Sequence, residues 1–489
     1  MKHYLSTLYF FGFLLMAYLV YQPASNGNFF MDDFDHFTNE CLTFTDFFTG
    51  TCRRWYQPLA YSLVKLDILY DNNPPYFSHF TAIILHGFYS WMIFFILKKF
   101  MQVHAAILGA MFFLFHSVTV TPVSWVGEIH QSMVSVFVLL TGWFCYLYNH
   151  SSQQFLRYYL LCFLFFALSI FCKESGVNAF GIMLIVTFYF QFRRRETECR
   201  SNQHTKRWLL LIPFFLITVG YSYIRLFCME NIQFFGEQDY RMMFGLNVIE
   251  NLGRYLLVIC SPFSSVHLFQ LGLAEDYIFL SLLLVIFTIP FIFGFLFFIK
   301  NNIRTGVFFI LLFLASTLPY ILLRKASEGY VYQPLGIFSI FMGFVVNELF
   351  NLNKRYKFAT YLFMGIFIII SFISVRNKIE LLLRNGKSAE KIISEVLTYK
   401  KEIDKADSLI MFDGEKEAVT YSIYLQEGFQ LIFNAPDIKN ILNVRLKRDN
   451  LMARVVPLHR VPEIKITENV VALIYERGRV RRVLQGIKN

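Results

Sequence analysis

Long apolar runs separated by short polar segments make up the first three quarters of the chain. In a window of about 19 residues, about eleven of these runs are long enough to cross a bilayer, which takes roughly 17–25 helical residues. The pattern therefore predicts a polytopic α-helical membrane protein. The predicted transmembrane helices are 4–22, 77–97, 104–121, 131–148, 156–172, 175–192, 208–227, 277–299, 305–323, 331–350 and 358–375.

The segment 246–274 does not fit a simple series of crossings. It is moderately apolar, yet it carries Glu250, Arg254, Pro262 and His267. A full crossing here would move all later basic loops to the opposite side of the membrane. We expect a re-entrant or interfacial helix on the outer side, since irregular backbone at membrane depth is tolerated where it lines a cavity.

Basic residues gather in alternate loops, which predicts the orientation by the positive-inside rule. These loops, together with the N-terminus, are expected to be cytoplasmic. The opposite loops are acidic or mixed, and the long loop 23–75, for which we expect interfacial helices, holds seven acidic and three basic residues. The expected location is the cytoplasmic (inner) membrane, or the endoplasmic reticulum membrane of a eukaryote. The cytoplasmic basic groups are Lys98–Lys99, Arg193–Arg195 with Lys206–Arg207, Lys300 with Arg304, and Lys354–Lys357.

Composition supports this reading and excludes others. The chain has 489 residues, of which 56% are hydrophobic and 16% charged, against about 25% charged in a soluble domain. The net charge of +11 does not indicate nucleic-acid binding, because the cations flank apolar runs. Eight cysteines show no CxxC pair, so neither a zinc nor a redox motif is indicated. Cys41 and Cys52 could form a disulfide if loop 23–75 faces an oxidising compartment.

The pattern changes near residue 377. A charged helical stretch is followed by alternating strand and helix patterns, among them "SLIMF" and "VVALIYERGRVRRVL". We expect residues 1–376 to form the multi-span domain. Residues 377–489 are expected to form a small soluble α/β or α+β domain, which lies outside the cytoplasm by parity of the spans and could bind a protein partner.

An acidic cluster, "GNFFMDDFDHF", follows the first apolar run. Asp32 and Asp33 lie at the outer end of that helix, where charges need not be buried in lipid. A carboxylate at a membrane-edge cavity can act as general base toward a hydroxyl, or hold a cation. The alternative is that one of them only caps a helix.

Further ionisable residues fall in or near the outer loops. His79 and His86 are seven residues apart and share a helix face, so they either line an internal cavity or tie helices together by hydrogen bonds. Paired cations in "LLRKASEGYVYQPLG" suit a phosphate, or else they anchor the chain at the interface. The remaining candidates are His116, Glu128, His130, Lys173, Glu174, Arg324, Lys325, Glu328, Tyr330 and Tyr332.

The serial order of these segments resembles the GT-C superfamily of integral membrane glycosyltransferases. The motifs are "FFMDDF", "WYQPLAYS", "PPYFSHFTAIILH", "FHSVTVTPVSWVGEIHQS", "FCKESGVNA" and "SEGYVYQP", and they cover about residues 1–375. The nearest likeness is to the protein O-mannosyltransferases and to related enzymes that carry tetratricopeptide repeats, which this chain lacks. The resemblance implies about eleven spans, a polyprenyl-phosphate sugar as donor, and inversion at the anomeric carbon.

Carried over to this sequence, the resemblance makes Asp32 or Asp33 the catalytic or acceptor-binding carboxylate. It matches Lys173 and Glu174 to a Lys-Glu pair of the family, and the loop of Glu328 and Tyr330 to one associated with the donor phosphate. Two arginines that the family often carries are Gln57 and Gly329 here. The cations that could compensate are Arg324, Lys325 and Arg254.

The leading hypothesis is a glycosyltransferase that moves a sugar from a polyprenyl-phosphate donor to an acceptor glycan, lipid or protein on the extracytoplasmic face. The first alternative is a catalytically degenerate scaffold that binds a partner protein, and the second is a lipid or sugar transporter. No metal-ligand set with suitable spacing occurs, so no metal cofactor is expected. The catalytic candidates are Asp32 and Asp33; the phosphate-binding candidates are Arg324, Lys325, Tyr330, Tyr332 and Arg254; the cavity candidates are His79, His86, His116, Glu128, His130, Lys173, Glu174, Glu328 and Gln57.

Overall fold

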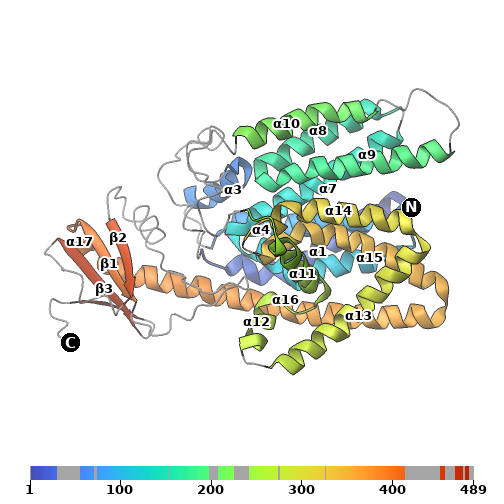
Figure 1. Ribbon diagram of the computed structural model, residues 1–489. Coiled ribbons are helices and arrows are strands. Elements are labelled where there is room, and N and C mark those ends of the chain that lie inside the picture. Colours follow the sequence, from blue (N-terminus) through green and yellow to red (C-terminus); the bar gives the residue numbers. More distant parts are fainter. Residues whose placement is uncertain are drawn as a thin grey trace.

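The protein is a helical bundle with a small sheet beyond one end, as seen in a computed structural model (Figure 1). The described part of the N-terminal half is built from helices, several of which follow one another after short turns. The residues described are 2–29, 33, 56–70, 74–151, 153–197, 207–224, 242–273, 276–324, 326–413, 452–457, 469–476 and 479–483. The first elements are α1 (Lys2–Tyr21), η1 (Gln22–Asn26), α3 (Pro58–Leu69), α4 (Tyr76–Lys98), α5 (Val103–Phe115), η3 (Ser117–Thr119), α6 (Val120–Ser124), η4 (Val126–Glu128), α7 (Ile129–His150), α8 (Phe155–Cys172), η5 (Glu174–Val177) and α9 (Asn178–Thr197).

The second half continues the bundle and ends in the sheet. In Figure 1 the sheet lies beyond the end of the long helix α16, on the side away from the N-terminus. The elements are η6 (Arg207–Leu211), α10 (Ile212–Tyr223), α11 (Leu246–Cys260), α12 (Ser265–Leu273), α13 (Tyr277–Asn301), α14 (Ile303–Ile321), η8 (Glu328–Val331), α15 (Tyr332–Leu352), α16 (Lys354–Leu397), α17 (Lys400–Ile403), β1 (Ser408–Asp413), β2 (Met452–Pro457), β3 (Val470–Glu476) and β4 (Arg479–Arg482).

Length and composition identify the spanning helices. Within the described residues, eight helices are long and apolar enough to cross a membrane, or up to nine if the bent pair α5 and η3–α6 counts as one span. Residues Arg207–Tyr223 form a shorter apolar helix, and α9 occupies the predicted run 175–192. The protein is therefore an integral membrane protein, while the total of eleven spans stays a prediction.

Aromatic rings and small residues hold the helices together. In lipid, helices associate through van der Waals packing rather than through the hydrophobic effect. The ring centroid of Phe367 on α16 lies 5.0 Å from that of Phe112 on α5 and 5.5 Å from that of Phe291 on α13. Where α5 crosses α15, a Cβ added to Gly109 would lie only 3.2 Å from the Gly343 Cα, so small residues permit this close approach.

The run 104–121, predicted as one straight helix, is broken in the structure. Helix α5 ends at Phe115, and the chain bends by 47° before η3 and α6. His116 makes the break because its backbone is extended and its Nδ1 accepts a hydrogen bond from the Val118 N–H at 3.2 Å. A side chain that captures a free backbone donor in this way caps the new helical turn. The bend leads directly into the turn that carries Glu128.

Segment 246–274 forms two short helices, α11 and α12, separated at Ser261–Ser264. Each is shorter than the roughly 20 residues that a crossing requires. Asn251 on α11 donates hydrogen bonds to the carbonyl oxygens of Ile321 and Leu323, at 3.2 and 2.7 Å. Helix α11 therefore lies against the end of α14, next to the loop that contains Glu328.

Helix α16 extends well beyond the predicted span 358–375. It runs from Lys354 to Leu397 without a break, so the boundary predicted at 376/377 falls within it. The described strands form one mixed sheet in the order β2-β1-β3-β4, with β1 parallel to β2 and β3, and β3 antiparallel to β4. The Val480 N–H of β4 donates to the Glu395 carboxylate of α16 at 2.5 Å, which attaches the sheet to the helix. That residues 377–489 form a soluble extracytoplasmic unit stays a prediction.

Among the predicted cytoplasmic cations that the structure describes, Lys98 lies at the end of the bundle where α1 begins and α4 ends. The Nζ of Lys98, at the end of α4, lies 4.9 Å from the ring centroid of Tyr9 in the first half of α1. At the same end, Gln102 before α5 hydrogen-bonds Asn351 at the end of α15, at 3.0 Å. The connections that carry the acidic and motif residues, such as η4, η5 and η8, follow the opposite ends of the spans.

Candidate functional site

A cluster of ionisable side chains forms where η4, η5 and η8 meet. Its members come from segments up to three hundred residues apart in the chain, so only the fold brings them together. They are Asp33, Gln57, Glu128, His130, Lys173, Glu174 and Tyr330, which we call the outer cluster.

Asp33 is fully buried, and its carboxylate lies against the η4 turn. A Cβ added to Gly127 would lie 3.0 Å from Asp33 Oδ1 and 3.2 Å from the Trp125 indole. The absence of a side chain at Gly127 thus lets the carboxylate reach the turn next to Glu128. Asp32, the other predicted catalytic residue, lies outside the described residues, as do Cys41 and Cys52.

Glu128, His130 and Lys173 lie in contact with one another through the imidazole. His130 Nε2 lies 3.3 Å from Glu128 Oε2 and 2.7 Å from Lys173 Nζ. One imidazole nitrogen cannot donate to the carboxylate and accept from the ammonium at the same time. The tautomer of His130 therefore decides which of the two hydrogen bonds its Nε2 makes.

The short turn after α8 places Lys173 in the cluster. Lys173 has an extended backbone, and Gly176 closes the turn so tightly that an added Cβ would lie 2.3 Å from the Ser169 carbonyl oxygen. The side chain of Lys173 is buried, and its ammonium lies 5.2 Å from the centre of the Tyr330 ring. This distance is within the range of a cation–π contact. Lys173 is thus a buried cation whose ammonium contacts the His130 imidazole and the Tyr330 ring.

The loop η8 forms another wall of the outer cluster. A Cβ added to Gly329 would lie 3.0 Å from Glu128 Oε2, so the glycine gives this carboxylate its room. Tyr330 stacks on Tyr320 with ring centroids 4.7 Å apart. Gly329 stands where the family that the motifs resemble often has arginine. The Glu128 carboxylate takes the space that a side chain would need there, and the nearby cation is Lys173.

Gln57 and Glu174 close the cluster on the side of the long outer loop. Gln57 Nε2 donates to Glu174 Oε2 at 3.4 Å, and Gln57 directly precedes α3. Nearby, Tyr255 of α11 donates its hydroxyl to the Tyr320 carbonyl oxygen at 3.4 Å. Burial raises the pKa of Tyr255, which keeps this hydroxyl neutral and able to donate.

Three of the four predicted cavity histidines, His79, His86 and His116, lie between helices. Each imidazole Nε2 hydrogen-bonds a backbone carbonyl of another segment: His79 that of Gly27 at 3.0 Å, His86 that of Leu114 at 3.0 Å, and His116 that of Ile259 at 2.9 Å. His86 Nδ1 also pairs with the Tyr332 hydroxyl at 2.9 Å. These contacts fit the alternative in which the histidines tie helices together. The hydrogen bond with His86 also occupies the Tyr332 hydroxyl, a predicted phosphate-binding group.

Of the predicted phosphate-binding cations, the two that the structure describes, Arg324 and Arg254, do not join the outer cluster. Arg324 is exposed after the end of α14, and Lys325 lies outside the described residues. Arg254 lies 3.8 Å from Glu250 on the surface of α11, with 54% of its side chain exposed. Lys173 is therefore the buried cation of the described cluster.

Sequence reasoning missed two buried polar residues that organise the site. Lys378 of α16 pairs with Glu328, and Asp67 of α3 accepts hydrogen bonds from the first turn of α4. A lysine just after an apolar run was the available signal for Lys378. Glu328 was itself a predicted cavity residue, but the sequence does not show that its loop meets α16.

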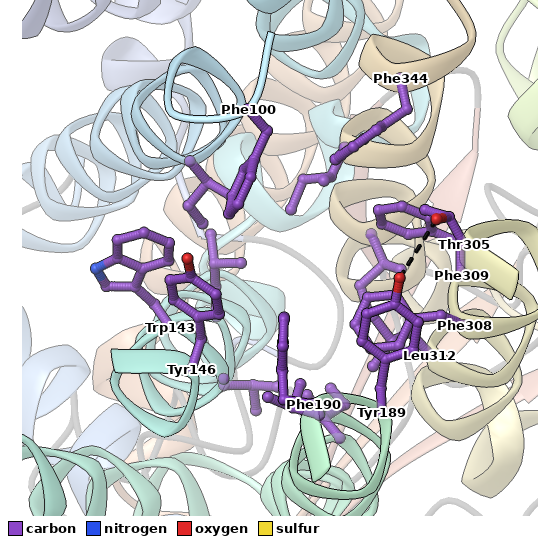
Figure 2. Close-up of a pocket in the computed structure, with 18 of the residues that line it drawn as sticks. Phe100, Trp143, Tyr146, Tyr189, Phe190, Thr305, Phe308, Phe309, Leu312 and Phe344 are labelled. Carbon is purple, nitrogen blue, oxygen red and sulfur yellow. Dashed lines mark hydrogen bonds between the residues drawn. The ribbon is translucent and has the colours of Figure 1, made fainter. Parts of the chain in front are cut away.

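A second feature is an apolar cavity of about 200 Å³ between α4, α7, α9, α14 and α15 (Figure 2). It begins about 12 Å along α7 from His130, at Val138, and extends toward the end of the bundle that carries Lys98, where Phe100 lines it. Aromatic rings such as Phe100, Tyr146, Phe190 and Phe344 surround it, and Tyr189 contacts Thr305 by a hydrogen bond of 3.3 Å at one side.

Within the described residues, no group of three or more His, Cys, Asp or Glu side chains could hold a metal ion. The outer cluster brings the buried carboxylate of Asp33 into one place with the buried cation Lys173 and the imidazole of His130. This combination can accept a proton from a hydroxyl and attract an anionic group at the same time.

The fold matches that of ArnT from Cupriavidus metallidurans, in crystal structures bound to undecaprenyl phosphate and in the apo state. The TM-scores are 0.51 and 0.52, with 12% and 11% identity, and each alignment covers 94% of this chain and 92% of ArnT. No sequence family and no curated protein matches the chain. The chain thus shares the overall fold of ArnT, while the resemblance to the O-mannosyltransferase branch is not confirmed.

Proposed function

We propose that this protein is a membrane glycosyltransferase that moves a sugar from a polyprenyl-phosphate donor to an acceptor hydroxyl. The observation that carries the proposal is the outer cluster, in which Asp33 and Lys173 come together in a fold shared with ArnT. ArnT has been crystallised with undecaprenyl phosphate, which supports a lipid phosphate as the leaving group here.

In the proposed reaction the acceptor oxygen attacks the anomeric carbon while the bond from that carbon to the phosphate oxygen breaks. The electron pair of that bond stays with the phosphate, and Asp33 or Asp32 takes the acceptor proton. Attack opposite the leaving group inverts the anomeric centre. A positioned general base of this kind contributes roughly 10²–10⁴-fold in rate.

Lys173 is the proposed partner of the donor phosphate. It is buried and lies among polar side chains, so a charge-assisted hydrogen bond to phosphate is stronger here than one at an exposed surface. This assignment takes the place of the predicted cations Arg324 and Arg254, which lie outside the cluster, and it keeps Tyr330 beside the phosphate-binding cation. Lys173 also weighs against the alternative of a catalytically degenerate scaffold. The site keeps a cation even though Gln57 and Gly329 stand where the family often has arginine.

The apolar cavity provides a place for part of the polyprenyl chain. It lies between the spanning helices and is lined mainly by aromatic and aliphatic side chains (Figure 2). A hydrocarbon chain there would leave its phosphate directed toward the outer cluster. The acceptor would then approach from the extracytoplasmic side, where the acidic loop 23–75 and the C-terminal sheet are expected. We place the protein in the cytoplasmic membrane on the same argument of charge distribution.

Native mass spectrometry of the detergent-purified protein with undecaprenyl phosphate tests the phosphate site. We expect binding by the wild type, and at least tenfold weaker binding by Lys173→Met because a charge-assisted contact is lost. Arg324→Met is the matched control, since this exposed cation follows α14 outside the cluster, and binding should be retained. Failure of the wild type to bind the lipid, or equal binding by Lys173→Met, would contradict the proposal.

A further inference from the structure

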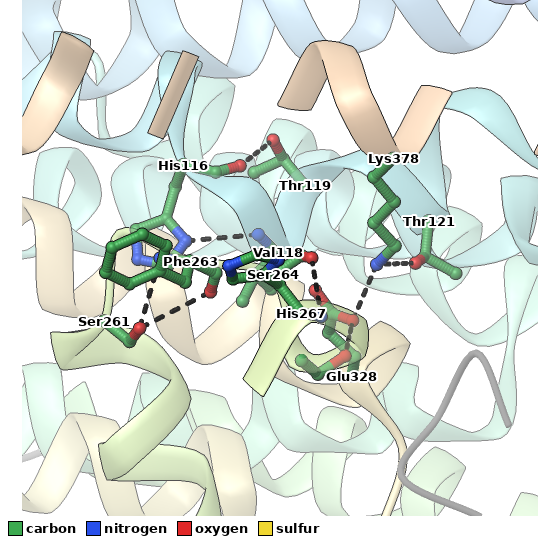
Figure 3. A network of polar contacts seen from close by, with 11 residues as sticks. His116, Val118, Thr119, Thr121, Ser261, Phe263, Ser264, His267, Glu328 and Lys378 are labelled. Atoms are coloured by element: carbon green, nitrogen blue, oxygen red, sulfur yellow. Dashed lines mark hydrogen bonds and ion pairs between the residues drawn. The ribbon is translucent and has the colours of Figure 1, made fainter. Parts of the chain in front are cut away.

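Lys378 is a buried cation on α16, the helix that links the bundle to the C-terminal sheet. Its side chain is 1% exposed, and its Nζ lies 2.6 Å from Glu328 Oε2 and 2.8 Å from Thr121 Oγ1 (Figure 3). Lys378 is not among the site residues predicted from the sequence. A buried charge persists in such a place only when it is paired and hydrogen-bonded.

Glu328 joins several separate segments through one carboxylate. Besides Lys378, it accepts a hydrogen bond from the Ser265 hydroxyl of α12. The carboxylate therefore connects η8 with α12 and α16, and through Lys378 with Thr121 of α6 (Figure 3). Since loss of either ionic partner would leave a buried charge without its counterion, the start of η8 is fixed with respect to α16.

The two residues after Glu328 form a wall of the outer cluster. Gly329 lies against the Glu128 carboxylate, with 3.0 Å from its Cβ position to Oε2. Tyr330 lies under the Lys173 ammonium and stacks on Tyr320. A shift at Glu328 would therefore move the backbone that holds both Glu128 and Lys173.

We propose that Lys378 is a positioning residue for the outer cluster. Its ion pair with Glu328 holds η8 so that Glu128 and Lys173 keep the geometry that transfer requires. The inference rests on the proposed function for its catalytic consequence, but the structural link holds independently of the substrate. Because Glu395 of the same helix binds β4, the sheet and the cluster share one rigid element.

The test uses the full chain with both partners neutralised, Lys378→Met together with Glu328→Gln. This change avoids leaving one buried charge alone, so the protein should fold. Arg376→Met is the matched control, because Arg376 lies two residues away on the same helix and instead donates to the Val20 carbonyl oxygen at 3.3 Å. The measurements are kcat and donor KM for sugar transfer, the melting midpoint, and hydrogen–deuterium exchange of residues 126–130 and 326–332.

We expect the neutral pair to lower kcat by roughly tenfold to a hundredfold, since misplacement of about 1 Å has this effect. Donor KM should change less than kcat, the melting midpoint should stay near that of the wild type, and exchange should rise in both segments. The control should show none of these changes. Unchanged exchange, or wild-type kcat in the neutral pair, would overturn the inference. If the wild type transfers no sugar, the proposed function fails, and the exchange result alone decides the positioning role.

Discussion

Gly127 lies where the Asp33 carboxylate meets the Trp125 indole, and this contact shows how closely the site depends on single atoms. The Cβ position of Gly127 is 3.0 Å from Asp33 Oδ1, which is closer than side-chain contacts normally allow. A methyl group here would displace the carboxylate by a few tenths of an ångström. The position of the proposed base is therefore set by a residue that takes no part in the chemistry.

Gly127→Ala should lower the rate of sugar transfer by roughly tenfold or more, because the base moves relative to the acceptor. The folded protein should persist with little change in its melting midpoint. Gly365→Ala is the control, since nothing lies within 4 Å of its Cβ position, and it should keep the wild-type rate. An equal rate for Gly127→Ala and the wild type, measured in the same membranes, would contradict this role of Gly127.

The residues of the outer cluster could be predicted from sequence because charge is costly in lipid. Asp33, Glu128 and Lys173 stood out as ionisable groups at the ends of apolar runs. Lys378 did not, since the value of a buried cation depends on its partner, and Glu328 is distant in sequence. For the same reason, the sequence could not show that His79, His86 and His116 tie helices together. Their carbonyl partners are known only from the folded chain.

Among the secondary-structure elements, the spanning helices were the most predictable, since bilayer thickness fixes their length. The break at His116 and the extension of α16 to Leu397 were not. In the first case a side chain captures a backbone donor and ends the helix. In the second, the charged stretch after 375 continues the helix because the sheet and η8 pack against it.

The start of α4 depends on a cap from a different helix. Asp67 of α3 accepts hydrogen bonds from the N–H groups of Phe77 and Ser78, at 2.9 and 2.8 Å, and from the Ser78 hydroxyl at 2.6 Å. The side chain of Asp67 is fully buried, so water cannot replace it. This cap fixes α3, and with it Gln57, relative to the spanning bundle.

Asp67→Ala should therefore reduce the free energy of unfolding by about 2 kcal/mol, as expected for loss of a buried cap. Asn353→Ala removes an exposed cap, in which Asn353 Oδ1 accepts from the Arg355 N–H at 2.9 Å, and it should have a smaller effect. Thermal melting of both variants in detergent measures the difference. The same midpoint for both would show that Asp67 does not have this structural role.

At the scale of the whole molecule, Lys98 and the outer cluster lie at opposite ends of the bundle. Lys98 lies beside Tyr9 at one end, while Lys173 and Glu128 lie in the turns of the other. The positive-inside rule predicts that the first end faces the cytoplasm. On this prediction the C-terminal sheet would lie outside, exposed to an acceptor or to a partner protein.

Labelling of single cysteines from each side of the membrane checks this orientation. In a background in which Cys41, Cys52, Cys199 and Cys228 are serine, Lys99→Cys should react with an impermeant maleimide only from the cytoplasmic side. Ser394→Cys should react only from the outside, because α16 carries it beyond the bundle. Labelling of both positions from the same side would contradict the predicted topology, in which an odd number of spans separates Lys99 from Ser394.

The most direct measurement is sugar transfer by the purified protein in proteoliposomes, supplied with a panel of polyprenyl-phosphate sugars. We predict transfer from at least one donor by the wild type, with loss of polyprenyl-linked sugar matched by glycosylated acceptor. Asp33→Asn combined with Asp32→Asn should reduce the rate by roughly 10²–10⁴-fold without unfolding the protein. Transfer at the wild-type rate by this double variant, or the absence of transfer from every donor by the wild type, would contradict the central claim.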